Sequence, residues 1–346
     1  IVKEGERREK KRESFAQRAE IQNETGVMIR AQLKESSYVA GKREIFEIIF
    51  NKKEENGLNS ETVLDSSISR WGIWQDRKKR EGEGSVYKNS TMFLKQLYNG
   101  RDNIFEKFGG EKGSLKTIFA AEEAFIVSGH TEEALEILET ILNENSSNFT
   151  WNDRCYTLYL ISKYIDTFKD IYFLKKNYSK IETEILHPVL SQMAEENYEK
   201  SFLFSYIVGK FIEEADFFIE SSKLEPYNIK IKEIKAKYGN KIDKKESMFY
   251  SLINGNKLSE DEIKEEIRKN SSSEKEEIAK NLELMLYVED KEFIRENLKK
   301  IEKNSEENDG IIPEYVKKEG KYKRYGEEGI GSYINSIYII VKGRVE

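Results

Sequence analysis

Cysteine, histidine and proline are scarce in this chain of 346 residues. The single cysteine, Cys155, excludes an internal disulfide. The two histidines, His130 and His187, are far apart in sequence and neither stands in a cluster with metal-ligand spacing, so we expect neither a metal site nor a cofactor. Only three prolines are present, and because proline breaks helix interiors, long stretches of the chain are able to stay helical.

An excess of positive charge and a long apolar run are also lacking. The formal net charge is −6, whereas proteins that bind nucleic acid usually show a clustered positive excess. The one dense basic stretch, Arg7–Arg12, is interrupted by Glu9 and is typical of a solvated helix or tether. A membrane-spanning helix needs an apolar run of about 18 residues, and no run in this sequence is that long. We therefore expect no nucleic-acid partner and no membrane span.

Apolar residues spaced three and four apart are abundant, and this spacing is typical of amphipathic helices. We expect helices at five such places: Val27–Leu33, Ile45–Phe50, 115–122, 135–142 and Ile330–Val341. Strand signals are weak, and the best candidate is a hairpin near Ile312–Tyr325, with its turn around Glu319-Gly320.

Two helix starts and one helix break are marked by local sequence. Ser259 with Glu262, and Ser273 with Glu276, have the capping-box spacing. The dipeptide His187-Pro188 predicts a break between two helices, because the residue before proline resists the α conformation.

Short breaks rich in Gly, Asn and Ser separate the helices, and no long linker divides the chain. We therefore predict a polar lead-in over residues 1–20 and one all-α domain over residues 21–346. Helices that arrive as hairpins suit either a closed α/α toroid or an open α-solenoid. The absence of a strict period of about 34 residues argues against regular tetratricopeptide repeats.

The order of short segments along the chain resembles a known family. These segments are Asn56-Gly57-Leu58, Val63–Trp71, Ser114–Leu142, Trp151–Tyr164, Lys244–Leu252, Asn308–Tyr315 and Gly331-Ser332-Tyr333. Their order is similar to that of bacterial glycoside hydrolase family 8, especially its exopolysaccharide-acting branch in Gram-positive bacteria, over roughly residues 25–342. The resemblance implies an (α/α)6 toroid and inverting endo-hydrolysis of a β-linked polysaccharide. Such hydrolysis needs two carboxyl groups roughly 6.5–9.5 Å apart.

The chain departs from the family where the functional carboxyl groups would stand. Ser66 occupies the expected place of the acid, Thr117 that of a sugar-contacting aspartate, and Tyr250 that of a later aspartate. A hydroxyl group does not serve as a general acid near neutral pH, so the chain resembles a glycosidase that has lost its catalytic pair.

A shift of one to three residues in this placement leaves another pair open. Asp65 is adjacent to Ser66, and Glu122 or Glu123 follows Thr117 by about one helical turn. Asp65 and Glu122 are therefore the candidate catalytic residues if hydrolysis survives.

Aromatic residues supply the candidate sugar-binding surface, because a pyranose ring stacks on aromatic faces. Trp71 and Trp74 lie one helical turn apart, and Trp151 precedes Asp153; the alternative interpretations are core packing and a helix start capped by Asn152 or Asp153. The other candidates for ligand contact are Ser66, Tyr250, Tyr315, Tyr325 and Tyr333.

Two functions follow from these patterns. The first is a carbohydrate-active toroid that recognises a β-linked polysaccharide or oligosaccharide, with lost or shifted catalytic acids. The second is a non-enzymatic α-solenoid that docks another protein, for which a membrane-associated protein is a candidate partner. The sequence begins at Ile1 without methionine, which indicates either a processed chain or a fragment. We expect a location outside the cytoplasm or at the cell surface. The oligomeric state stays open.

Overall fold

The computed structural model describes residues 18–22, 28–33, 46–51, 84–100, 115–143, 148–194, 197–216, 218–239, 246–273, 275–306, 312–313, 315–317, 322–323 and 328–345. The chain forms two compact units, Ile1–Arg77 and Lys78–Glu346. The sequence had instead predicted a boundary between residues 20 and 21.

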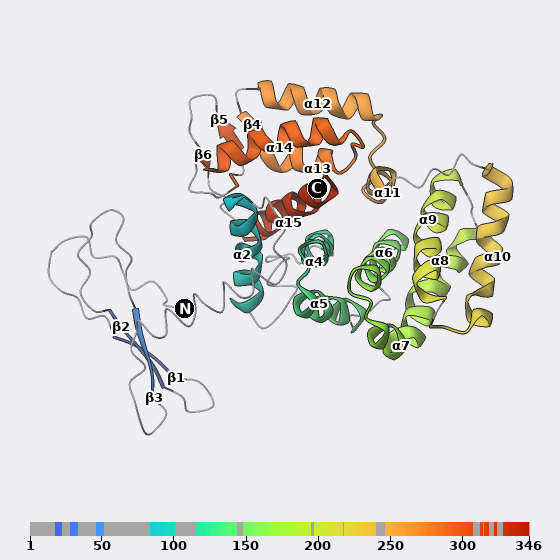
Figure 1. Cartoon of the computed structure of the whole chain (residues 1–346), viewed down its shortest axis with the longest axis horizontal. Helices are drawn as coiled ribbons and strands as arrows, with labels where there is room; N and C mark the ends of the chain where they lie inside the picture. The colour runs from blue at the N-terminus through green and yellow to red at the C-terminus, as the bar shows by residue number, and fades with distance from the viewer. Residues whose placement is uncertain are drawn as a thin grey trace. The chain divides into compact units, whose positions relative to one another are not determined.

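Three strands form the described part of the first unit (Figure 1). They are β1 (Arg18–Gln22), β2 (Met28–Leu33) and β3 (Phe46–Asn51), which make an antiparallel sheet in the order β1-β2-β3. The helices predicted at Val27–Leu33 and Ile45–Phe50 are therefore wrong. Both runs are short, and Ile45–Phe50 is rich in isoleucine and phenylalanine, which favour strands. The pairing of β2 with β3 gives the backbones of both runs partners.

The second unit is mostly helical, which confirms the all-α class for the larger part of the chain. Its helices in the first half are α2 (Ser85–Gly100), α4 (Leu115–Ser128), α5 (Thr131–Asn143), α6 (Trp151–Phe168), α7 (Ile171–Lys180), the π-helix η3 (Ile181–Leu186), α8 (His187–Ser191), η4 (Gln192–Ala194) and α9 (Tyr198–Ala215). The second half contains α10 (Ser221–Tyr238), α11 (Glu246–Ile253), α12 (Glu260–Ser272), α13 (Ile278–Met285), α14 (Lys291–Glu306) and α15 (Glu328–Val345).

A small sheet lies beside these helices. Its strands are β4 (Lys275–Glu277), β5 (Tyr315–Lys317) and β6 (Tyr322–Lys323), paired antiparallel in that order. The β5–β6 pairing, in which Val316 faces Tyr322, confirms the predicted hairpin.

One of the two predicted capping boxes is present. The Ser259 hydroxyl accepts from the backbone N–H of Glu262 at 3.4 Å, and the Glu262 carboxylate accepts from the backbone N–H of Ser259 at 2.8 Å, at the start of α12. The box at Ser273 and Glu276 is wrong, because Glu276 lies in β4. Its carboxylate instead accepts hydrogen bonds from the Ser271 hydroxyl and the Asn281 amide.

Pro188 does not separate two helices, contrary to the prediction. The π-helix η3 precedes it, and His187 donates its N–H to the carbonyl of Glu182, five residues back. Proline has no N–H for the carbonyl of Glu184, and this carbonyl accepts a hydrogen bond from Arg154 Nε at 3.3 Å. The wider turn and the arginine together allow the helix to continue through the proline.

The helices of the second unit contact one another in a definite order (Figure 1). Contacts join α15 to α4, α4 to α6, α6 to α9, α9 to α11, and α13 to α15. The Ser247 N–H of α11 also donates to Glu289, which follows α13, at 3.0 Å. A second set of helices packs on the outside of this group: α5 on α4 and α6, α10 on α9, α12 on α13, and α14 on α15 and α2.

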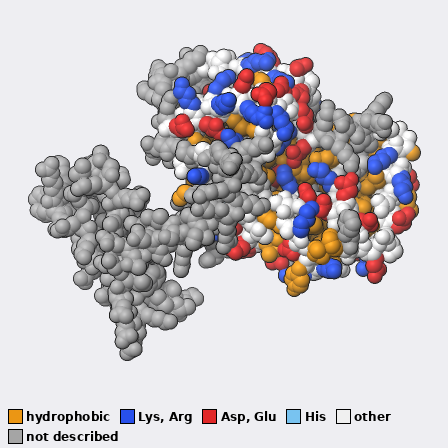
Figure 2. All heavy atoms as spheres, viewed as in Figure 1, with side chains coloured by type: hydrophobic (Ala, Val, Ile, Leu, Met, Phe, Trp, Pro, Cys, Tyr) orange, Lys and Arg blue, Asp and Glu red, His pale blue; other side chains and the backbone are white. Residues whose placement is uncertain are grey.

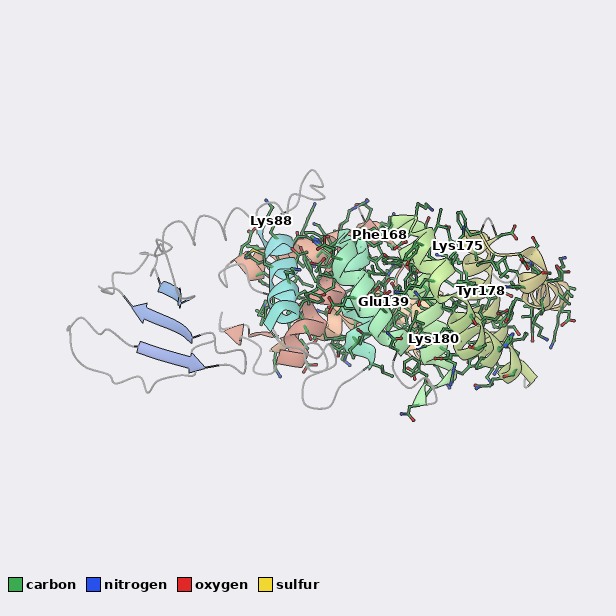
Figure 3. The ribbon with its side chains drawn as sticks, turned by 90° about the horizontal axis from the view of Figure 1, so that it is seen from below. Lys88, Glu139, Phe168, Lys175, Tyr178 and Lys180 are labelled. Atoms are coloured by element: carbon green, nitrogen blue, oxygen red, sulfur yellow. The ribbon has the colours of Figure 1, made fainter. Side chains whose placement is uncertain are left out.

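Surface contacts connect α5 and α7 on the outside of the unit. Lys176 of α7 forms an ion pair with Glu139 of α5 at 2.8 Å, and Lys180 donates to Asn143 at 3.1 Å. Figure 3 shows α5 and α7 side by side, with Glu139, Lys175 and Lys180 on the face toward the viewer. Among the described residues, no helix is both long and apolar enough to cross a membrane.

Helix α4 is apolar on nearly all sides, yet it carries two adjacent, fully buried glutamates, Glu122 and Glu123. Both carboxyl oxygens of Glu122 lack a hydrogen-bond partner among the described residues. Burial, together with the neighbouring charge of Glu123, raises the pKa of Glu122 well above its ordinary value of 4.5. Glu122 therefore holds its proton to a higher pH than an ordinary glutamate does.

Replacing Glu122 by glutamine should remove a pH-dependent loss of stability. The unfolded chain ionises Glu122 above pH 4.5 while the folded chain keeps it protonated, so the wild-type free energy of unfolding falls as the pH rises toward the folded-state pKa. Relative to wild type, Glu122→Gln should gain stability between about pH 4 and pH 7, by up to about 1.4 kcal/mol per pH unit. Denaturant unfolding measures this difference. The exposed Glu136→Gln is the control, and a pH-independent difference for Glu122→Gln would contradict the assignment.

Candidate functional site

A buried carboxylate lies at the centre of the helices. Glu123 of α4 is 0% exposed. Its Oε1 accepts hydrogen bonds from the Lys163 ammonium at 2.7 Å, from the Tyr159 hydroxyl at 3.2 Å and from the Tyr250 hydroxyl, and its Oε2 accepts from the Tyr156 hydroxyl at 3.0 Å. Helices α4, α6 and α11 are thereby joined through one side chain.

A second carboxylate, Glu246 at the start of α11, shares these donors. Its Oε1 accepts from the Tyr159 hydroxyl and from Lys163 Nζ at 3.2 Å, while its Oε2 pairs with Arg344 Nε of α15 at 3.4 Å. Burial opposes ionisation of Glu246, but the charges of Lys163 and Arg344, the Tyr159 hydrogen bond and the charge of Lys210 lower its pKa to about 2. Glu246 is therefore an ionised carboxylate at neutral pH.

Arg344 contacts Glu246 and also attaches the end of α15 to the end of α13. Its guanidinium donates to the main-chain carbonyls of Met285, Leu286 and Val288, where α13 ends, at 2.7–3.2 Å. The planar group thus uses its several donors on three carbonyls and a carboxylate, which suits arginine and not lysine.

The tyrosines of this centre act as hydrogen-bond donors. Burial and the charge of Glu123 raise the pKa of Tyr156, Tyr159 and Tyr250 well above 10. Their rings pack around Phe249, which stacks on Tyr159 with a centroid distance of 4.1 Å and meets Tyr156 edge-on at 5.5 Å. The aromatic packing holds the hydroxyls toward Glu123.

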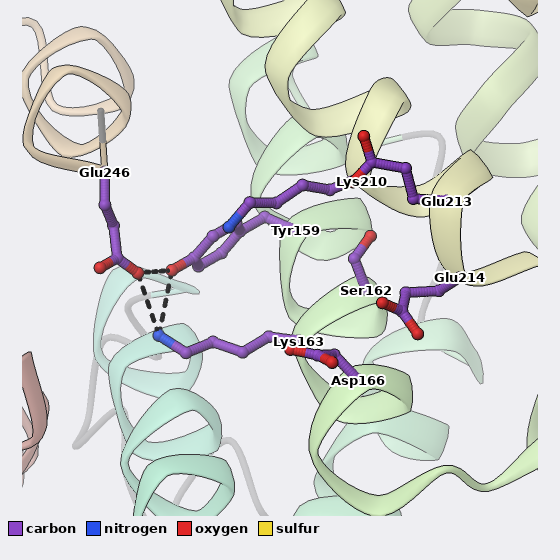
Figure 4. Close-up of a pocket in the computed structure, with 8 residues that line it drawn as sticks. All are labelled: Tyr159, Ser162, Lys163, Asp166, Lys210, Glu213, Glu214 and Glu246. Atoms are coloured by element: carbon purple, nitrogen blue, oxygen red, sulfur yellow. Dashed lines mark hydrogen bonds and ion pairs between the residues drawn. The ribbon is translucent and has the colours of Figure 1, made fainter. Parts of the chain in front are cut away.

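A pocket of about 200 Å³ opens beside this centre, between α6, α9 and α11. Figure 4 shows the residues that line it: Tyr159, Ser162, Lys163, Asp166, Lys210, Glu213, Glu214 and Glu246. Exposure increases outward, because the side chain of Lys163 is 21% exposed, that of Glu246 29% and that of Asp166 67%. Lys163 and Glu246 therefore form the inner part of the pocket and Asp166 lies at its mouth.

Lys210 differs from the other charged residues of the pocket. Its ammonium lies 4.8 Å from the centre of the Tyr206 ring and 5.7 Å from that of the Tyr159 ring. Within the residues that the structure describes, it makes no hydrogen bond and no ion pair, and Figure 4 shows it beside Tyr159 without a bonded partner. Burial lowers the pKa of Lys210.

Three of the site residues predicted from the sequence, Tyr250, Glu122 and Tyr333, lie in or near the core. Tyr250 donates to Glu123 and is fully buried, while Glu122, on the same helix as Glu123, does not line the pocket. Tyr333 lies near the start of α15, with Lys116 Nζ 5.2 Å from its ring centre.

Trp151 and Asp153 lie at the start of α6. The Trp151 indole donates to the carbonyl of Val189 at 3.2 Å, and Asp153 completes a capping box with Thr150, which is the N-cap. This matches the alternative of a helix start, with Thr150 in place of Asn152 or Asp153 as the cap. Tyr315 lies in β5, and neither it nor the other two residues line the pocket.

The remaining candidates lie outside the described residues: Asp65, Ser66, Trp71, Trp74 and Tyr325. The pairing of Asp65 with Glu122 therefore stays a prediction.

Sequence reasoning named Glu123 only as an alternative and missed Lys163, Lys210, Glu246 and Arg344. One signal was present: a charged residue within an apolar stretch of a helix, as at Glu123 and Lys163, has to find a partner in the core. Among the described residues, no group of three or more His, Cys, Asp or Glu side chains is arranged to hold a metal ion.

Comparison with known proteins finds no family model that matches the chain, no significantly similar curated protein and no significantly similar solved structure. The resemblance to glycoside hydrolase family 8 therefore stays a hypothesis, and the functional argument depends on the site itself.

Replacing Glu246 by glutamine tests the charged centre through its pH dependence. A folded-state pKa of about 2, below the ordinary 4.5, means that ionised Glu246 stabilises the fold above pH 4.5 and that this stabilisation is lost as the pH falls toward 2. Since one pKa unit corresponds to about 1.4 kcal/mol and solvent reaches part of the side chain, we expect Glu246→Gln to cost about 2 kcal/mol near pH 7 and little near pH 2.5.

Denaturant unfolding at the two pH values measures this cost. Glu265→Gln is the control, because its pair with Arg268 is exposed and spans 3.6 Å, so its loss should cost less than about 0.5 kcal/mol. An equal cost of Glu246→Gln at both pH values would contradict the assignment.

Proposed function

We propose that residues 78–346 form a toroid of paired helices that binds a saccharide in the pocket between α6, α9 and α11. The toroid is supported by the packing order: α15, α4, α6, α9 and α11 follow one another, α13 returns to α15, and the other helices pack on the outside. This is the arrangement that the resemblance to glycoside hydrolase family 8 led us to expect, within the second unit alone.

One observation carries the saccharide proposal: the pocket opens beside the buried centre, between α6, α9 and α11, and its lining is polar and charged. Carboxylates accept hydrogen bonds from sugar hydroxyls, while ammonium groups and hydroxyls donate to sugar oxygens. The volume of about 200 Å³ is below the usual 300–1,000 Å³ of pockets for drug-sized ligands, so the pocket suits one small polar unit.

The carboxyl groups favour binding over hydrolysis. Inverting hydrolysis needs one protonated and one ionised carboxyl group on opposite sides of the bond. Glu246 is held ionised by Lys163 and Arg344, and Glu122, whose pKa burial raises, is fully buried and does not line the pocket. Neither group supplies a proton to a bound sugar, so we propose a binding protein that resembles a glycosidase. A polysaccharide ligand fits a location outside the cytoplasm or at the cell surface.

Binding and cleavage should separate when the protein is incubated with β-linked oligosaccharides and with bacterial exopolysaccharide. We expect saturable binding by calorimetry and no release of reducing ends. Glu213→Tyr, which places a bulky ring at the exposed mouth of the pocket, should weaken binding by about tenfold or more. Glu225→Tyr on the exposed side of α10 is the matched control and should bind as wild type does.

Two results would contradict the proposal in different ways. Release of reducing ends would indicate an active hydrolase with other acids. An absence of binding to every saccharide would favour the second candidate, a protein-docking helical module. That candidate is supported by exposed apolar side chains outside the pocket, above all Tyr172 of α7, which is 76% exposed. Figure 2 shows hydrophobic side chains gathered near α7 on the visible face.

A further inference from the structure

Most charged residues of the pocket already form an ion pair with a partner. Lys163 pairs with Glu123 and Glu246, and Glu246 pairs also with Arg344. At the mouth, Asp166 and Glu214 both pair with Lys169, at 2.9 and 3.3 Å. The inner wall is therefore balanced in charge, while the rim keeps a net negative charge because one ammonium pairs with two carboxylates.

Lys210 stands out against this background. The structure gives its ammonium no ion pair and no hydrogen bond with another described residue, although it lines the pocket and is only partly exposed. The rings of Tyr206 and Tyr159 are its neighbours, at 4.8 and 5.7 Å from their centres. An ammonium over ring faces keeps its charge partly stabilised, while its remaining donors stay available.

We infer that Lys210 binds a carboxylate of the ligand, so that the pocket takes an acidic saccharide such as a uronic acid unit. This inference rests on the proposed saccharide-binding function and narrows it to one class of sugar. A partly desolvated ammonium gains most from an anionic partner, because a charge-assisted hydrogen bond is stronger than one to a neutral hydroxyl. The nearby carboxylates Glu213 and Glu214 then accept hydrogen bonds from the hydroxyls of the same sugar.

The second tyrosine contact explains why the position suits a lysine. The Tyr159 hydroxyl is held by Glu123 and Glu246, and the ring of Tyr206, on the same helix as Lys210, is the second aromatic neighbour of the ammonium. The pKa of Lys210, which burial lowers, rises again when an anion binds, and this favours uptake of the carboxylate.

The test compares two β-linked disaccharides of the same size, one of two glucose units and one with glucuronate in place of one glucose. Calorimetry should show the acidic disaccharide binding about tenfold tighter to the wild-type chain. Lys210→Met should remove this preference and bring the two affinities within about threefold of each other, while Lys210→Arg, which keeps the charge, should retain most of it. Lys232→Met, on the exposed side of α10, is the control and should keep the wild-type preference.

Three other results of this experiment would overturn the inference, and each has a different meaning. Equal binding of both disaccharides, unchanged in Lys210→Met, would overturn the acidic specificity and leave the saccharide proposal standing. Binding of acetate as tight as that of the acidic disaccharide would leave an anion site without sugar recognition. Binding of neither disaccharide would overturn the inference and the proposed function together.

Discussion

The burial of the Glu123 carboxylate is the constraint on which the centre of this protein depends. A carboxylate that is 0% exposed is strongly unfavourable unless charge and hydrogen bonds compensate it. Four donors do so: Lys163, Tyr156 and Tyr159 from α6, and Tyr250 from α11. Because removing any one leaves part of a buried charge unsatisfied, α4, α6 and α11 keep a fixed relative position.

The same constraint shapes the pocket. Lys163 and Tyr159 are shared between Glu123 and Glu246, and Arg344 connects Glu246 to the end of α15 and to the carbonyls after α13. The inner wall of the pocket therefore consists of side chains that are already committed to one another. In the proposed saccharide-binding function, specificity comes from the groups nearer the mouth, among which Lys210 has no ion-pair partner within the described residues.

Local sequence patterns correctly predicted structures that depend on neighbouring residues. The same patterns gave wrong predictions where contacts between distant parts of the chain determine the secondary structure. The cap at Ser259 and the β5–β6 hairpin could be recognised because each depends on residues a few positions apart. The run Ile45–Phe50 has the spacing of a short helix, but its pairing with β2 makes it a strand. The break at Pro188 was mispredicted because the compensating donor, Arg154, comes from another helix.

The candidate site was even harder to predict from local sequence patterns than the secondary structure was. Two adjacent glutamates in an apolar helix could be identified as candidates, but their sequence does not tell which one is ionised. Glu123 and Lys163 are 40 residues apart, and Tyr250 is 127 residues from Glu123, so only the packing of α4, α6 and α11 brings them together. Glu122 lies in the same core, and its carboxyl oxygens have no hydrogen-bond partner among the described residues.

A double-mutant cycle between Glu123→Gln and Lys163→Met tests the central claim most directly. The free energies of unfolding of the wild type, both single variants and the double variant give the coupling between the two side chains. A buried ion pair at 2.7 Å predicts a coupling free energy of more than about 1 kcal/mol near pH 7. Each single variant should lower the free energy of unfolding by about 3–5 kcal/mol, because it leaves the other charge buried without its partner. A coupling within about 0.3 kcal/mol of zero would contradict a buried Glu123 held by Lys163 at the centre of the helices.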